Sequence, residues 1–216
     1  GSILSGARRV LTTPYLAGIA LYIVLYSTLS TFLYFEQARI VAEHLGDADE
    51  RTRLFAFMDL AVNVLTVLAQ LFVAARVTQH AGVAVSLALV PLLVAVGFFV
   101  LGVWALPATL VVFQIVRRAG NYAIARPARE MLFSVLSAED RYKSKSFIDT
   151  VTYRGGDAAS GWAFALLKGA GLSPAAIAFI AVPIAVIWGV TGYLLGRSYE
   201  RRSEQLPVDR RSMDRR

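Results

Sequence analysis

Apolar residues gather along this 216-residue chain in six long runs, which short polar or charged segments separate. Each run is close to the ~20 residues that an α-helix needs to cross the hydrocarbon core of a bilayer. The runs cover, approximately, Tyr15–Phe35, Leu54–Ala75, Val83–Leu106, Ala108–Ala125, Ser146–Leu167 and Pro174–Leu195. The pattern predicts an all-α membrane protein whose residues 15–196 form a bundle of six transmembrane helices.

The join between the third and fourth runs needs a break in the helix. The stretch from Ala81 to Val116 carries no charged residue and is too long for a single span. Within it, the segment "WALPAT" contains Pro107, which disfavours helix at Leu106 and suits the first turn of a following helix. We therefore expect a tight hairpin at this point.

Composition supports a membrane location. Hydrophobic residues make up 56% of the chain, charged residues make up 17%, and the mean hydropathy is +0.57, which is more apolar than soluble domains of this length usually are. The chain has no cysteine, and its two histidines, His44 and His80, lie outside the apolar runs. Disulfides and cysteine-based zinc sites are therefore impossible, and we expect no metal or other cofactor.

Basic residues are distributed unequally between the two ends of the predicted helices. Fifteen fall on the side that holds both termini, four fall on the opposite side, and three lie within the runs. The positive-inside rule then places both termini in the cytoplasm, and this topology explains the net charge of +7 better than nucleic-acid binding does. We expect residues 1–14 to be a cytoplasmic lead-in, whose first two residues resemble a cloning scar, and residues 197–216 to be a basic, disordered tail.

The runs differ in how polar residues are arranged around them. In the second run, Asp59, Asn63, Thr66 and Gln70 are spaced by 4, 3 and 4 residues, which puts them on one stripe of a helix. The third and sixth runs are apolar nearly all round and tolerate lipid. We therefore expect the first, second, fourth and fifth helices to line something polar, with the third and sixth as outer supports.

Two adjacent arginines, Arg117 and Arg118, interrupt the fourth run about halfway across its predicted span. Insertion scales give a cost of roughly 2.5–3.5 kcal/mol for each such charge at the centre of a membrane helix. Asn121 lies one turn beyond Arg117 and widens the polar face. Charges this expensive need a partner, either an acidic side chain or a ligand.

The fifth run also contains charged and polar residues. Asp149, Tyr153 and Asp157 lie at i, i+4 and i+8 and so form one stripe of a helix, and Arg154 lies beside that stripe. One interpretation is structural: an arginine of the fourth run pairs with an aspartate of the fifth and sets the helix register. The other is an anion site at the midplane, because these arginines outnumber the two aspartates and guanidinium groups match phosphate or carboxylate. On the second interpretation the substrate-binding residues are Arg117, Arg118, Asn121, Tyr153 and Arg154, and the coupling or ion-pair residues are Asp59, Asp149 and Asp157.

Catalytic chemistry has little support in the sequence. The patterns HExxH, GxSxG and GxxxxGK[ST] are absent, and there is no cysteine nucleophile. We therefore do not expect an enzyme. The segment "REMLFSVLSAEDRYKSK" combines an apolar cluster with a charged end, which predicts an interfacial helix or a loop packed beneath the bundle.

The run "ARPAREMLFSVLSAEDRYKSKSFIDTVTYRGGD", from Ala125 to Asp157, resembles the ATP/ADP translocase family of bacterial parasites and plastids, and resembles its bacterial major-facilitator relatives still more. The resemblance extends over most of the chain and includes "YFEQARIVA". It implies the carboxy-terminal six-helix half of a twelve-helix major facilitator in a bacterial inner membrane. Arg154, Lys143 and Lys145 match basic residues of the family. Asp157 stands where the nucleotide exchangers carry a lysine, which argues against strict ATP/ADP exchange.

We therefore expect a secondary transporter half that moves a small anionic solute, with nucleotide-like solutes as one class, by alternating access. Its partner would be the amino-terminal six-helix half of the same transporter or a second copy. The alternative is a membrane-embedded interaction or sensor domain that kept this bundle and lost transport.

Overall fold

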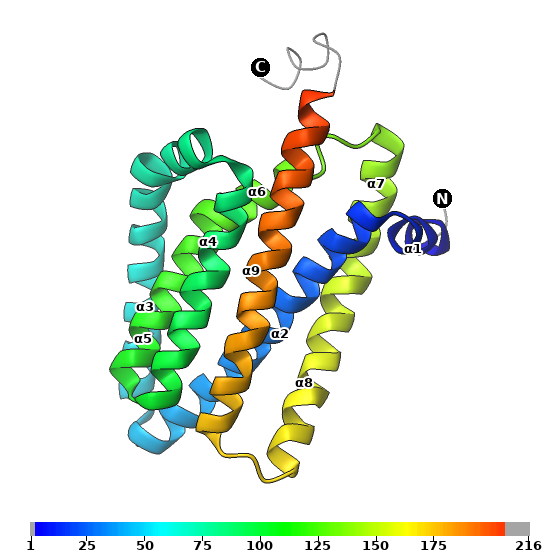
Figure 1. The fold of residues 1–216 in the computed structure, drawn as a ribbon. Coiled ribbons are helices and arrows are strands. Elements are labelled where there is room, and N and C mark those ends of the chain that lie inside the picture. The colour runs from blue at the N-terminus through cyan, green and yellow to red at the C-terminus, as the bar shows by residue number, and fades with distance from the viewer. Residues whose placement is uncertain (1–2, 206–216) are drawn as a thin grey trace.

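The computed structural model describes residues 3–205, and within them all side chains except those of residues 3–7, 138–140, 146, 149 and 151. The described part is helical almost throughout and contains no strand, so the predicted all-α class is confirmed (Figure 1). Its α-helices are α1 (Ile3–Thr12), α2 (Pro14–His44), α3 (Ala48–Ala69), α4 (Ala75–Val103), α5 (Pro107–Gly120), α6 (Arg126–Met131), α7 (Ala138–Phe147), α8 (Tyr153–Gly169) and α9 (Pro174–Glu204). Three π-helical segments connect some of them, namely η1 (Gln70–Ala74), η2 (Asn121–Ala125) and η3 (Ile148–Thr152).

Three helical stretches are long and apolar enough to cross a membrane, judged by length and composition: Pro14–His44, Ala48–Val103 and Pro174–Glu204. The protein is thus a membrane-embedded helical protein. Helices α5 and α8, which hold most of the polar residues of the fourth and fifth runs, are not among those stretches in the described part of the chain.

The second of these stretches turns back on itself. Gly82 lies inside it with φ 81° and ψ 175°, far from helical values, and Figure 1 shows α4 running in the opposite direction to α3. Glycine adopts a positive φ readily because it has no Cβ. The second and third apolar runs therefore lie in two helices that run in opposite directions within one 56-residue stretch.

The predicted hairpin between the third and fourth runs is confirmed. Helix α4 ends at Val103, and α5 begins at Pro107, which occupies its first turn. Leu106 has an extended backbone with φ −103° and ψ 151°, as expected for a residue before proline. Helices α4 and α5 are thus joined by a connection of three residues.

Helices α4 and α9 pack against each other along most of their length (Figure 1). Glycines allow the close approach: a Cβ added at Gly196 would lie 2.2 Å from Cα of Ala84, and one added at Gly192 would lie 2.8 Å from the carbonyl oxygen of Leu87. Small residues have this role in many membrane helix pairs. On their other faces the two helices expose apolar side chains, among them Val96 and Leu194.

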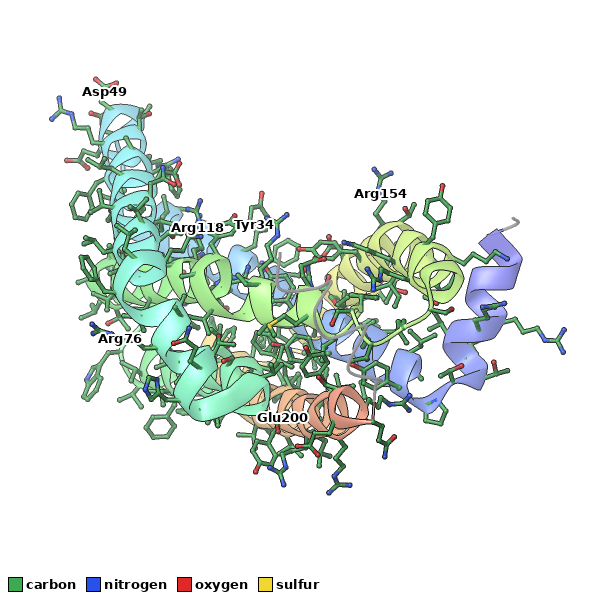
Figure 2. All side chains as sticks on the ribbon, turned by 90° about the horizontal axis from the view of Figure 1, so that it is seen from above. Tyr34, Asp49, Arg76, Arg118, Arg154 and Glu200 are labelled. Atoms are coloured by element: carbon green, nitrogen blue, oxygen red, sulfur yellow. The ribbon has the colours of Figure 1, made fainter. Side chains whose placement is uncertain are left out.

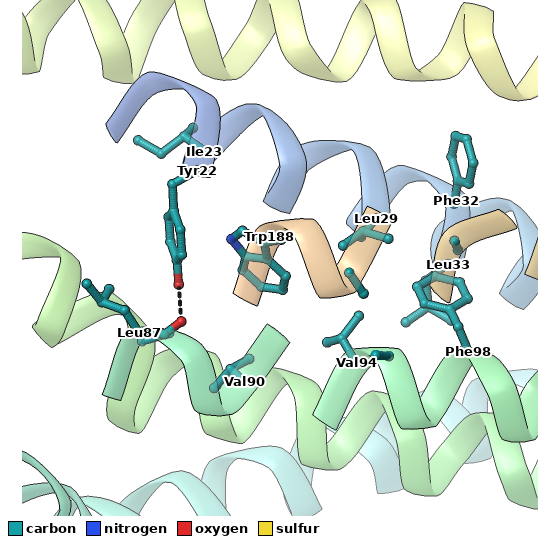
Figure 3. Close-up of a cluster of buried hydrophobic side chains, with 14 of the residues drawn as sticks. Tyr22, Ile23, Leu29, Phe32, Leu33, Leu87, Val90, Val94, Phe98 and Trp188 are labelled. Atoms are coloured by element: carbon teal, nitrogen blue, oxygen red, sulfur yellow. Dashed lines mark hydrogen bonds between the residues drawn. The ribbon is translucent and has the colours of Figure 1, made fainter. Parts of the chain in front are cut away.

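The apolar core lies where α2 meets this helix pair (Figure 3). Trp188 of α9 is 1% exposed, and its ring centroid is 5.3 Å from that of Tyr22 in α2. The Tyr22 hydroxyl donates a hydrogen bond of 3.0 Å to the carbonyl oxygen of Leu87 in α4. One side of α2 is therefore fixed by packing, and its other sides carry polar residues toward α5 and α8.

Helices α3 and α8 flank the bundle and bury little of their surface. Helix α3 packs on α5 but buries only Met58 and Val62. Helix α8 packs on α2 and leaves Trp162 74% exposed. Figure 2 shows the two helices on opposite sides of α5 and α2.

The segments near the ends also pack. Leu132 and Phe133 are buried, which agrees with a loop packed beneath the bundle. Helix α9 continues through Glu204, so the predicted disordered tail does not begin at residue 197. Its last turns are held because Arg202 lies over the ring of Tyr15 at 4.6 Å and Glu200 accepts a hydrogen bond of 3.3 Å from the backbone N–H of Ala84. Residues 1–2 and 206–216 lie outside the described residues.

Candidate functional site

Arg118 of α5 forms an ion pair with Asp59 of α3. Its Nη1 donates to Oδ1 of Asp59 at 2.6 Å, and the two side chains are 33% and 61% exposed. The structural interpretation expected an acid from the fifth run, but Arg118 finds its partner on the second, because α5 packs against α3. The pair lies on the face of the bundle between α3 and α8 (Figure 2).

Arg117 has no such acid. Its Nη1 donates to Oγ of Ser30 at 3.0 Å, and its Nη2 donates to Oε1 of Gln114 at 3.1 Å. Its Nε is buried and has no hydrogen-bond partner, and no ion pair joins Arg117 to a described acidic side chain. This partly buried guanidinium is held only by neutral groups in the described part of the chain, so no described acid compensates its positive charge and one donor is unused. An anionic ligand would satisfy both.

Polar contacts continue in a row between α2 and α5. The pairs are Gln37–Gln114 at 2.5 Å, Ser30–Arg117 at 3.0 Å and Tyr26–Asn121 at 3.3 Å. Because the two helices run in opposite directions, the row extends along the bundle from the Gln37 end of α2 toward its middle. Asn121 thus lies on the same polar surface as Arg117, as the sequence predicts.

Helix α8 presents its predicted residues to different surroundings. Oδ1 of Asp157 accepts a hydrogen bond from Ser27 of α2, and the Tyr153 ring lies 6.1 Å from that of Tyr26. Arg154 is exposed and points away from the bundle in Figure 2, so the structure does not bring it to Arg117 or Arg118. The side chain of Asp149 lies outside the described residues.

A pocket of about 470 Å³ opens beside Asn121. Three tyrosines line it, contributed by α2, η2 and the start of α8, and so do four charged residues from α6 and α7. The residues are Tyr26, Tyr122 and Tyr153, with Arg126, Arg129, Glu130 and Lys145. We call it the tyrosine pocket. The π-helical segment η2 contributes Asn121 and Tyr122 to its lining, and π-helical turns inside longer helices occur often at functional sites.

Comparisons with protein-family models, with curated proteins and with solved structures found no match to this chain. The site is therefore interpreted from its own geometry. Within the part of the chain that the structure describes, no three His, Asp or Glu side chains lie together in a way that would hold a metal ion.

The sequence interpretation named Asn121 and Tyr153 as substrate-binding residues but missed the charged residues that line the tyrosine pocket with them. It counted Arg126, Arg129 and Lys145 as loop charges that set the topology. A signal was present, because Tyr122, Arg126 and Arg129 follow one another at spacings of 4 and 3 residues, which places them on one face of a helix. The continuation of the helix through η2 into α6 is what keeps them on that face.

Proposed function

We propose that this chain is one six-helix half of a secondary transporter that moves an anionic solute across a bacterial inner membrane by alternating access. The observation that carries the proposal is Arg117, a guanidinium with a buried, unpartnered Nε and no acidic partner among the described residues. Ionisable groups inside membrane-spanning segments usually mark substrate pathways. A guanidinium fork suits carboxylate and phosphate groups.

The distribution of polarity among the helices supports a two-half architecture. Helices α4 and α9 pack through glycines and expose apolar side chains, as lipid-facing supports would. Helices α3 and α8 flank the Arg118 side and remain largely uncovered. In this proposal their uncovered faces contact the amino-terminal half of the transporter, or a second copy of this chain. Helices α5 and α8 also cross the membrane, in addition to the three apolar stretches. Both termini would then lie in the cytoplasm.

The acidic residues have separate parts in this proposal. Asp59 neutralises Arg118 between transport events and releases it when a solute or the other half approaches. Asp157, whose Oδ1 accepts from Ser27, is a candidate carrier of a coupling proton. Arg117 is the residue that meets the solute, because its buried Nε has no hydrogen-bond partner and no described acidic side chain pairs with it.

Equilibrium binding of labelled ATP, ADP and smaller organic anions to the purified chain tests this proposal. Arg117→Gln and Arg118→Gln make the same change at adjacent positions. We expect Arg117→Gln to weaken binding roughly 10- to 100-fold, the worth of one or two charged hydrogen bonds. Arg118→Gln should have a smaller effect because Asp59 already neutralises that arginine. Thermal unfolding of both variants reports whether the bundle stays folded.

Equal losses in the two folded variants would contradict the role of Arg117. Absence of binding across the whole panel would favour the second candidate function, a membrane-embedded interaction or sensor domain. The exposed apolar surface of α3 and η1 favours that candidate: Phe57 and Leu60 of α3 are 58% and 63% exposed, and Leu71 of η1 is 69% exposed. Apolar surfaces of this kind mark contacts with protein or lipid. A stable homodimer that buries this face would support it further.

A further inference from the structure

The tyrosine pocket has an excess of positive charge. Arg126, Arg129 and Lys145 line it, and Glu130 is the one acidic side chain among the lining residues that the structure describes. Three cations and one carboxylate leave two positive charges to be compensated. A dianion would complete the pocket.

Glu130 already binds two of these cations. Its Oε2 lies 2.6 Å from Nζ of Lys145, and its Oε1 lies 3.7 Å from Nη2 of Arg129. Its side chain is 41% exposed, so it is free to swing away toward solvent. The carboxylate therefore stands where the oxygens of a bound anion would stand.

The remaining walls suit a flat organic group. The pocket volume of about 470 Å³ falls in the range of small-molecule sites and leaves room for more than an inorganic oxyanion. Tyr26 and Tyr153 are tilted by 50° with their centroids 6.1 Å apart, and Tyr122 adds a third ring. Tyrosines supply apolar faces together with hydroxyl donors.

We propose that the tyrosine pocket binds a doubly charged organic anion of the phosphate-monoester type, and that Glu130 forms ion pairs with Arg129 and Lys145 of the pocket when the ligand is absent. A phosphate monoester carries about −1.5 to −2 charges at neutral pH and three acceptor oxygens, which matches the excess of two positive charges. A single carboxylate matches it less well. The phosphate group belongs either to a soluble ester or to an anionic lipid headgroup. Arg117 is not among the lining residues, although Tyr26 and Asn121 belong both to the pocket and to the polar row that contains Arg117.

Phenyl phosphate is the probe for a soluble ester, measured by titration calorimetry with the purified chain in detergent. Nanodiscs with and without phosphatidic acid test the lipid source. Arg129→Gln should weaken binding of the effective probe roughly 10- to 100-fold. Glu130→Gln should strengthen it about threefold, because an internal competitor of modest strength is removed. Arg76→Gln is the matched control, since Arg76 is exposed on the α3 and α4 side of the bundle (Figure 2) and should change nothing.

The gain in affinity separates the proposal from a structural role, because a residue that only stabilises the fold would not improve binding when it is removed. Weaker binding in Glu130→Gln, or failure of both probes to bind, would overturn the proposal. Loss of phosphate-probe binding in Arg129→Gln but not in Arg117→Gln assigns the probe to the tyrosine pocket, whereas the opposite pattern assigns it to Arg117 and would overturn the proposal. The result therefore distinguishes failure of this site from failure of the proposed transport function.

Discussion

Helix α2 meets its neighbours in two different ways. Toward α4 and α9 it packs apolar rings and aliphatic side chains, with Trp188 1% exposed. Toward α5 and α8 it makes side-chain hydrogen bonds, such as Ser30–Arg117 and Thr28–Ser160. Close packing is costly to disturb, whereas individual polar contacts between membrane helices contribute little. The comparison indicates that the apolar side sets stability and that the polar side is available for a ligand.

The largest effect is expected at the centre of the apolar side. Trp188→Ala removes a fully buried ring that contacts Tyr22 and Tyr26 at centroid distances of 5.3 Å and 5.7 Å. We expect a loss of about 3–5 kcal/mol in the free energy of unfolding, because a large cavity remains. Denaturant titration followed by circular dichroism measures it. A loss below ~1 kcal/mol would show that this core is not closely packed.

Two glycines provide a matched pair with opposite expected signs. A methyl group at Gly196 would lie 2.2 Å from Cα of Ala84, whereas no atom lies within 4 Å of one at Gly161 in α8. Gly196→Ala should destabilise the protein by about 1–3 kcal/mol through overpacking. Gly161→Ala should leave it unchanged or stabilise it by up to ~1 kcal/mol through helix propensity. Thermal unfolding compares them, and equal shifts would contradict the difference between the two sides.

The smallest effect is expected for the pair on the polar side. A double-mutant cycle with Arg118→Ala and Asp59→Ala should give a coupling free energy of about 0.2–1 kcal/mol, because the side chains are 33% and 61% exposed and water screens exposed pairs. Denaturant titration of the four proteins measures it. A coupling of several kcal/mol would mean that lipid or protein, rather than water, surrounds the pair.

Apolar run length predicted where the chain is helical, although only three stretches in the described part are long and apolar enough to cross a membrane. Five of the six runs lie within helical segments and the third does so except for residues 104–106, because a stretch of this length and composition satisfies its backbone only as a helix. The hairpin followed from Pro107, whose effect on Leu106 is local. Features that depend on neighbouring residues along the chain were therefore accessible from sequence.

The partners of the charged side chains were harder to predict. Spacing shows that Asp59 shares a stripe with Asn63 but not which helix that stripe meets, so the pair with Arg118 depends on tertiary packing. Arg154 lies next to Tyr153 in sequence, yet a rotation of about 100° per residue turns it away from the bundle. Assembly of the tyrosine pocket from five helical elements is likewise a property of the fold.

Water access to the polar side tests the central claim most directly. The chain has no cysteine, so Asn63→Cys on the polar stripe of α3 and Val96→Cys on the outer face of α4 can each be labelled without background. Both positions are exposed in the structure, Val96 by 61%. With a charged methanethiosulfonate reagent applied to membranes, the account predicts fast reaction at position 63 and little at position 96. Equal rates at the two positions would contradict a water-accessible polar side opposite a lipid-facing one.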